Sequence, residues 1–124
     1  MFQYSSRNIF LNLLTRSRLR AVASLSGGKD YPDIRGLVKF YASPHRESAM
    51  YGGAIVEAEI FSLPAPESGG DSSFFGFHIH ENGDCSDNFS HAGSHFNPSG
   101  RPHPYHAGDL PPLLSSHGKG WTAF

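Results

Sequence analysis

Histidine is concentrated in a short part of this chain, and that concentration limits how the chain can fold. Six of the eight histidines lie between Phe77 and Asp109. They are His78, His80, His91, His95, His103 and His106. Neutral imidazole and carboxylate groups are the ligands that zinc and copper prefer in proteins. The fold must bring these side chains together, and their spacing predicts a site for two metal ions.

The remaining composition favours a single β domain. The chain has 124 residues, of which 38% are hydrophobic and 17% charged, enough for one modest core. Its 14 glycines and nine prolines favour strands and turns over long helices. We expect an N-terminal arm over residues 1–20 and one domain over residues 21–124.

The arm contains four arginines and no acidic residue, which leaves six basic and eleven acidic residues in the remainder. A basic arm can bind nucleic acid or an anionic membrane, but a solvated tail is the more common outcome, and we expect neither partner. The apolar run at residues 9–14 is interrupted by Asn12 and precedes the arginines, unlike a secretory signal. No stretch approaches the ~20 apolar residues of a membrane span. A cytoplasmic location is therefore favoured over an extracellular one.

Three strands are predicted before the histidines, separated by turns rich in Gly, Pro, Asp and Ser. They cover residues 20–25, 34–41 and 54–61, with loops at 43–48 and 63–71. In the third strand Val56, Ala58 and Ile60 alternate with Glu57 and Glu59. This alternation predicts one buried face and one hydrated face.

A fourth strand is predicted at residues 75–80, where the first two of the clustered histidines lie. The two-residue period of a strand places Phe75, Phe77 and Ile79 on a packed face. His78 and His80 then share the exposed face and can chelate one metal ion. Because a His-x-His sequence alone is a weak signal, a pair of exposed strand histidines remains the alternative.

Residues 81–112 are rich in Gly, Pro, Asn, Ser and Asp and predict a long irregular loop. A loop of about thirty residues is uncommon in a small domain unless something organises it. His95, His103, His106 and Asp109 could bind a zinc ion with no open coordination position, as in structural zinc sites. Zinc bonds of ~2.0–2.2 Å require these ligating atoms to lie within about 4 Å of one another.

Three motifs resemble the copper/zinc superoxide dismutase family in its bacterial form. They are GFHIHE at residues 76–81, HFNP at 95–98 and HAGDLPPL at 106–113, and they follow the order of the family. The resemblance covers residues 21–124 and implies an all-β, immunoglobulin-like antiparallel Greek-key sandwich with a long metal-binding loop. It also implies that the chain dismutes superoxide, its small-molecule substrate, with copper and zinc as cofactors.

The resemblance further assigns roles to individual side chains. The implied copper ligands, which would also be the catalytic residues, are His78, His80 and His95. The implied zinc ligands are His95, which bridges the two metals, His103, His106 and Asp109. His91 matches no ligand position and is expected to be a solvated loop histidine. His45 and His117 are assigned no role.

The chain ends at Phe124, in what resembles the middle of the family's fifth strand. The resemblance places a further copper-binding histidine, a guiding arginine and the second cysteine of a disulfide beyond this point. We therefore expect an incomplete sandwich of about five of eight strands, a free Cys85 thiol, and weak or absent turnover. A lone cysteine is commonly buried, and uncovered sheet surface favours association, a homodimer included. The alternative is a non-catalytic, metal-binding dismutase-like module or a gene fragment.

Overall fold

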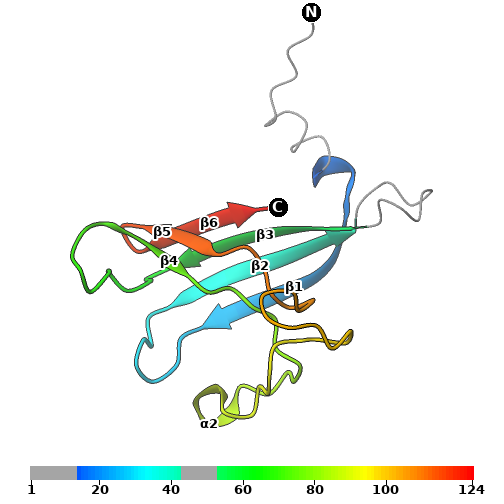
Figure 1. Ribbon diagram of the computed structural model, residues 1–124. Coiled ribbons are helices and arrows are strands. Elements are labelled where there is room, and N and C mark those ends of the chain that lie inside the picture. Colours follow the sequence, from blue (N-terminus) through cyan, green and yellow to red (C-terminus); the bar gives the residue numbers. More distant parts are fainter. Residues whose placement is uncertain (1–13, 43–52) are drawn as a thin grey trace, which may run out of the picture.

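The computed structural model describes residues 14–42 and 53–124, which form six antiparallel strands and a short helix, with residues 14–16 also helical (Figure 1). These elements are β1 (Arg18–Ser26), β2 (Arg35–Ala42), β3 (Ala54–Phe61), β4 (Ser72–Phe75), α2 (Ser86–Phe89), β5 (Leu113–Ser116) and β6 (Lys119–Ala123). The predicted all-β class is confirmed. The first three strands lie within two residues of their predicted bounds, although β1 begins inside the predicted arm. The loop predicted at 43–48 lies outside the described residues.

The strands pair in the order β1-β2-β3-β6-β5-β4, and every pair is antiparallel. Strands β4, β5 and β6 are neighbours in turn, and β3, which precedes them in the chain, lies beside β6. This is the Greek-key arrangement. The long connection between β4 and β5 carries all six of the clustered histidines to one side of the sheet (Figure 1).

The core is built on the inward face of β2 and β3. Val38 lies opposite Ala58 and Phe40 opposite Val56 in the strand register. Val38, Val56 and Ala58 are buried, whereas the intervening Glu57 and Glu59 are not. The predicted alternation of β3 is therefore confirmed. Further partly buried side chains pack against this cluster: Ala23, Leu25, Phe40 and Phe77.

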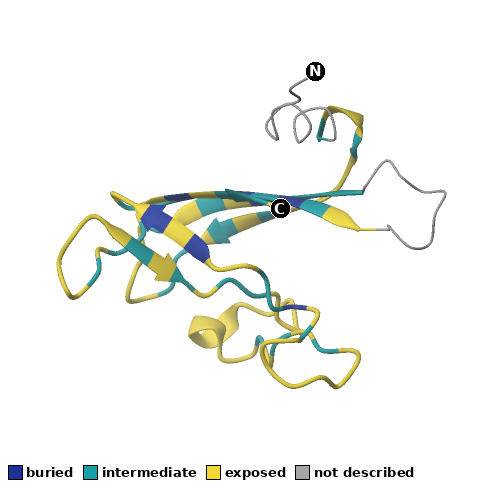
Figure 2. Ribbon diagram, turned by 45° about the horizontal axis from the view of Figure 1, so that its top comes forward, coloured by how far each residue is buried: buried dark blue, intermediate teal, exposed yellow. Residues whose placement is uncertain are grey.

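Strands β4 and β5 lie on one side of the other four, as the two views in Figures 1 and 2 show. Leu113 of β5 is only 2% exposed. It covers Gly120, where an added Cβ would lie 2.9 Å from Leu113 Cδ2. Phe74 and Leu114, paired across β4 and β5, are 70% and 48% exposed. This pair of strands therefore has one buried face and one uncovered apolar face.

The fourth strand differs from the prediction, because β4 ends at Phe75, before the histidines. Residues 76–80 form only isolated bridges, which join His78 to Asp109 and His80 to His95. The predicted packing of Ile79 is wrong: this residue is 37% exposed, because its partners are loop segments and not a second layer.

Strand β5 was not predicted, so the described residues contain six strands where about five were expected. Its sequence LLSS is too short to show the two-residue period of a strand, and the two prolines before it indicate a loop. No helix in the described part of the chain has both the length and the apolar character needed to cross a membrane.

Candidate metal centre

A closed ring of three backbone hydrogen bonds holds the candidate centre together. The Ile79 N–H donates to Gly108 O at 2.9 Å, the Gly108 N–H to Phe96 O at 2.8 Å, and the Phe96 N–H to Ile79 O at 2.8 Å. The ring joins three segments that are far apart in the sequence. It aligns these three segments with one another, as the hydrogen bonds between paired strands align a regular sheet.

Each member of this backbone ring is adjacent in sequence to predicted ligands. Those neighbours are His78 and His80, on either side of Ile79, His95 before Phe96, and Asp109 after Gly108. Gly108 is itself required, since an added Cβ would collide with Ile79 O and lie 3.0 Å from Phe96 N. The close approach of the three backbone segments therefore determines the positions of the adjacent ligands.

The carboxylate of Asp109 is the centre of the predicted zinc set. Its Oδ1 accepts a hydrogen bond from His95 Nδ1 at 2.7 Å. Its Oδ2 lies 3.1 Å from His103 Nδ1 and 3.2 Å from His106 Nδ1. The Asp109 side chain is only 6% exposed, so all three rings direct the same nitrogen at a largely enclosed anion.

The structure thus brings together all four predicted zinc ligands. Their ligating atoms lie within 4.8 Å of one another, somewhat wider than the expected limit of about 4 Å. Within residues 14–42 and 53–124, no other group of three or more His, Cys, Asp or Glu side chains converges in this way.

The state of His106 supports a cation at this position. Its Nδ1 is buried and makes no hydrogen bond within the described residues, despite lying 3.2 Å from Asp109 Oδ2. That oxygen instead accepts the backbone N–H of His106 at 3.1 Å. A buried ring nitrogen is normally paired. Three imidazoles and one carboxylate are also the donor types of a zinc site, so the residues present fit this metal.

Electrostatics keep the Asp109 carboxylate charged. Burial would raise the pKa of Asp109, but the hydrogen bonds from His95 and from the backbone of His106 lower it. The nearby His106 and His103 rings act in the same direction, and the net pKa lies below the ordinary value. An ionised carboxylate at neutral pH is the form that can bind a metal cation.

The predicted copper ligands are close to one another but less ordered. The His78 ring is stacked on the His95 ring, with centroids 4.0 Å apart and an interplanar angle of 20°. The His80 ring meets His95 edge-on at 5.2 Å. Burial, and then the neighbouring His95, lower the pKa of His78, which favours the neutral ring that a metal requires. These rings would have to turn before all three could bind one ion.

Two hydrogen bonds decide which ring nitrogens remain available. His80 Nδ1 donates to Gly93 O at 2.9 Å, which leaves its Nε2 free. His95 Nδ1 is engaged by Asp109, so its Nε2 is on the opposite edge of the ring. A histidine held in this manner can contact one cation through each nitrogen.

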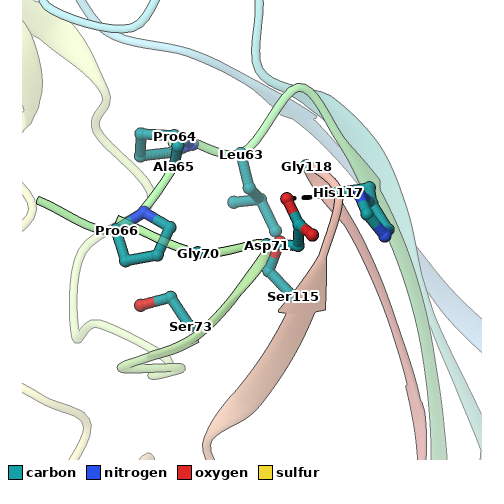
Figure 3. A pocket seen from close by; sticks show the side chains of 10 residues that line it. All are labelled: Leu63, Pro64, Ala65, Pro66, Gly70, Asp71, Ser73, Ser115, His117 and Gly118. Atoms are coloured by element: carbon teal, nitrogen blue, oxygen red, sulfur yellow. Dashed lines mark ion pairs between the residues drawn. The ribbon is translucent and has the colours of Figure 1, made fainter. Parts of the chain in front are cut away.

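The remaining histidines lie outside the centre. His117 occupies the β5–β6 turn, where its Nδ1 is 3.6 Å from Asp71 Oδ1. Figure 3 shows this pair beside a pocket of about 260 Å³ whose lining contains none of the clustered histidines. His91 is exposed, with its Nδ1 2.8 Å from Ser86 Oγ. His45 lies outside the described residues.

Cys85 is a free thiol, and it is exposed, so the expectation of burial is wrong. It lies just before α2, in a part of the loop whose side chains are all exposed. This segment has few apolar side chains, so it forms no core in which the thiol could be buried.

Sequence reasoning missed several residues that shape the centre. Asn97 Nδ2 donates to Arg101 O at 2.8 Å, and Asn97 Oδ1 accepts the Arg101 N–H at 3.0 Å. This reciprocal pair closes the turn between His95 and His103. The turn chemistry of the Asn-Pro-Ser-Gly sequence is the signal that could have indicated it.

The sequence can be compared with known proteins at this point. A family model for copper/zinc superoxide dismutase matches residues 34–124. The rat and mouse proteins named extracellular superoxide dismutase [Cu-Zn] are 34% and 35% identical over 92 residues, 74% of this chain. An Arabidopsis thaliana protein named superoxide dismutase [Cu-Zn] 3 is 34% identical over 106 residues, 81% of this chain. No solved structure matches significantly.

The chain spans 34% of the length of the two mammalian relatives and 55% of the plant relative. Because these relatives are animal and plant proteins, the bacterial form indicated by the motifs stays a prediction. The family model covers both the sheet and the whole histidine cluster. On this match, the chain belongs to the copper/zinc superoxide dismutase family.

Proposed function

We propose that the chain carries the metal centre of a superoxide dismutase. In this proposal His78, His80 and His95 bind copper, and His95, His103, His106 and Asp109 bind zinc. The observation that carries it is the convergence of three Nδ1 atoms on the Asp109 carboxylate, with the His78 ring stacked on the His95 ring and the His80 ring edge-on to it. This arrangement matches two adjacent sites that share one imidazole.

The residues of the chain have separate tasks in this proposal. The zinc ligands fix the loop and hold the His95 ring in one orientation. The Gly93 carbonyl holds His80 Nδ1, so that Nε2 of this ring is directed to the second site. His95 Nε2, when it is not bound to metal, can hold a proton.

Copper, when bound, supplies the one-electron redox chemistry of the reaction. Two superoxide anions and two protons then give one dioxygen and one hydrogen peroxide, so one superoxide is oxidised and the other reduced. Because the three rings assigned to copper must turn before they can bind one ion, we expect copper to be held more loosely than zinc.

The test is superoxide decay by the purified chain loaded with copper and zinc. Activity should exceed that of free copper under a chelator, and His80→Ala should abolish it. His91→Ala is the matched control, because this exposed histidine belongs to the same loop but not to the cluster. Zinc binding without copper-dependent turnover would instead support the non-catalytic module. Equal losses in both variants would contradict the assignment of His80.

We also propose that the chain self-associates through its uncovered apolar surface. The exposed pair Phe74 and Leu114 supports this, because contiguous apolar surface on a soluble domain tends to become an interface. Light scattering over a concentration series tests it. Phe74→Ser should shift the chain toward the monomer, and a monomer at all concentrations would contradict the proposal.

A further inference from the structure

The tip of the metal-binding loop is fastened to the turn between β1 and β2. The Lys29 N–H donates to Asn88 Oδ1 at 2.9 Å, across 59 positions of sequence. The loop also lies directly on Gly28, where an added Cβ would be 2.6 Å from Asn88 Oδ1 and 2.7 Å from Phe89 Cε2. We call Gly28, Lys29, Asn88 and Phe89 the latch. Any side chain at position 28 would push the loop away.

The backbone on the loop side of the latch has an unusual conformation. Asp87, Asn88 and Phe89 have φ angles of 49°, 53° and 70°, in the left-handed region. Non-glycine residues rarely adopt this region, and Asn does so more readily than most. Three such residues in succession need outside contacts to persist. The contacts with the β1–β2 turn meet that need.

A short path of backbone contacts leads from the latch to a predicted copper ligand. Phe89 O accepts the Ala92 N–H at 3.1 Å, and Ala92 O accepts the Asn82 N–H at 3.0 Å. The next residue, Gly93, places its carbonyl 2.9 Å from His80 Nδ1. The segment that the latch fixes is therefore the one that orients His80.

Three of the four zinc ligands depend on different contacts. His103 follows the turn that Asn97 closes, and Asp109 is next to the Gly108 backbone ring. His103 Nδ1 and His106 Nδ1 lie 3.1 and 3.2 Å from Asp109 Oδ2, and none of these three residues belongs to the segment 83–93. The latch therefore leads directly to His80, and among the zinc ligands only His95, two residues after Gly93, lies near the segment that the latch fixes.

We infer that Asn88 and Gly28 are positioning residues for His80. Through Gly93 they keep Nδ1 of this ring engaged, so that Nε2 is presented to the second metal. The inference rests on the proposed function, because the copper-binding role of His80 is part of that proposal. It assigns to the turn between β1 and β2 an influence on copper binding that exceeds its influence on zinc binding.

The experiment compares four variants of the full chain. Asn88→Ala removes the acceptor of the Lys29 N–H, whereas Asn88→Asp retains an oxygen there. Gly28→Val inserts a side chain into the contact, and Asp33→Ala is a control at an exposed position of the same turn. Cupric and zinc affinities are measured separately by competition with chelators. The ¹⁵N shifts of His80 and hydrogen exchange at the Lys29 amide are measured in the metal-free chain.

Asn88→Ala and Gly28→Val should lower cupric affinity about tenfold, the low end of the effect of outer-shell contacts on metal sites. Zinc affinity should stay within about twofold, and Asn88→Asp and Asp33→Ala should resemble the parent chain. In Asn88→Ala, the Lys29 amide should exchange faster and His80 should lose its single Nδ1–H tautomer. Should Gly28→Val fail to fold, the Asn88 pair still decides the question.

Two results would overturn the inference. One is an equal fall in zinc and copper affinity in Asn88→Ala, which would make the latch a support for the whole loop. The other is an unchanged His80 tautomer and unchanged cupric affinity in both disruptive variants. A parent chain that binds no copper would defeat the proposed function instead, while the tautomer of His80 would still report on the latch.

Discussion

The two halves of the metal centre are organised to different degrees. Three rings of the zinc half surround one enclosed carboxylate, and their nitrogens lie 2.7, 3.1 and 3.2 Å from its oxygens. In the copper half, His78 is stacked on His95, and His80 is held by a single carbonyl. The zinc half is therefore close to its binding geometry, whereas the rings of the copper half must turn before they can bind one ion.

In this centre, the enclosed carboxylate holds the ligating side chains in place more effectively than the neutral imidazoles do. Asp109 attracts donor groups from three positions at once, while imidazoles have nothing to converge on without a cation. A site that is organised beforehand loses less conformational freedom on binding. We therefore expect zinc to bind first and more tightly.

The strongest test of this comparison is Asp109→Ala. It removes both a ligand and the group around which the three histidines gather. Structural zinc binding amounts to ~10–16 kcal/mol over four ligands, so zinc affinity should fall at least about 100-fold. Competition with a chromophoric chelator measures it. Asp84→Ala, an exposed carboxylate in the same loop, is the control and should leave zinc affinity unchanged.

A second variant should weaken both halves together. Gly108→Ala forces the backbone ring apart, because its Cβ collides with Ile79 O. Overpacking of this kind costs ~1–3 kcal/mol, measurable by urea denaturation of the metal-free chain, and copper and zinc affinities should both fall. Gly83→Ala is the matched glycine control, since no atom lies within 4 Å of its added Cβ. Loss of affinity for one metal only would show that the ring serves one half.

A third variant should affect the zinc half alone. Asn97→Ala removes both hydrogen bonds that close the turn before His103. Each such bond contributes ~0.5–1.5 kcal/mol, so zinc affinity should fall at least about fivefold while cupric affinity is unchanged. Parallel titrations of both metals check this, with Ser99→Ala in the same turn as the control. An equal loss of copper affinity would contradict the separation of the two halves and show that they depend on the same contacts.

The smallest effect concerns acid stability of the metal-free chain. The pKa of Asp109 is lowered in the folded state, so its ionised form stabilises the fold at pH values above the unfolded value of 3.8. This contribution is lost as the pH falls through the folded pKa. The stability gap between the parent chain and Asp109→Asn should therefore shrink as the pH falls below about 3.8. Denaturation curves at each pH measure it, and a gap that widens in acid would contradict the sign.

The sequence predicted those features that depend on local period and residue type. The alternation of Val56, Ala58 and Ile60 located β3, and the types of His95 and Asp109 indicated a metal ligand set that the fold brings together. Both features can be predicted because polarity and metal-binding chemistry are properties of each residue type, whatever its partners in the fold.

The features that were missed depend on contacts between distant segments. The end of β4 at Phe75, the Gly108 backbone ring and the latch at Asn88 all arise from backbone groups that find partners far along the chain. Every residue has these groups, so residue identity does not reveal them. Only the three-dimensional arrangement shows which N–H meets which carbonyl.

The strand order has a consequence for how this chain would meet another copy of itself. Within the described residues, β1 and β4 are the two outer strands. Strand β1 carries Arg18 and Arg20, so two such edges would repel each other, whereas the β4 sequence SSFF has no charge. An uncharged edge with free backbone groups is open to addition of a further strand. Aggregation by sheet extension would therefore begin at β4, and a lysine placed at Ser72 would oppose it.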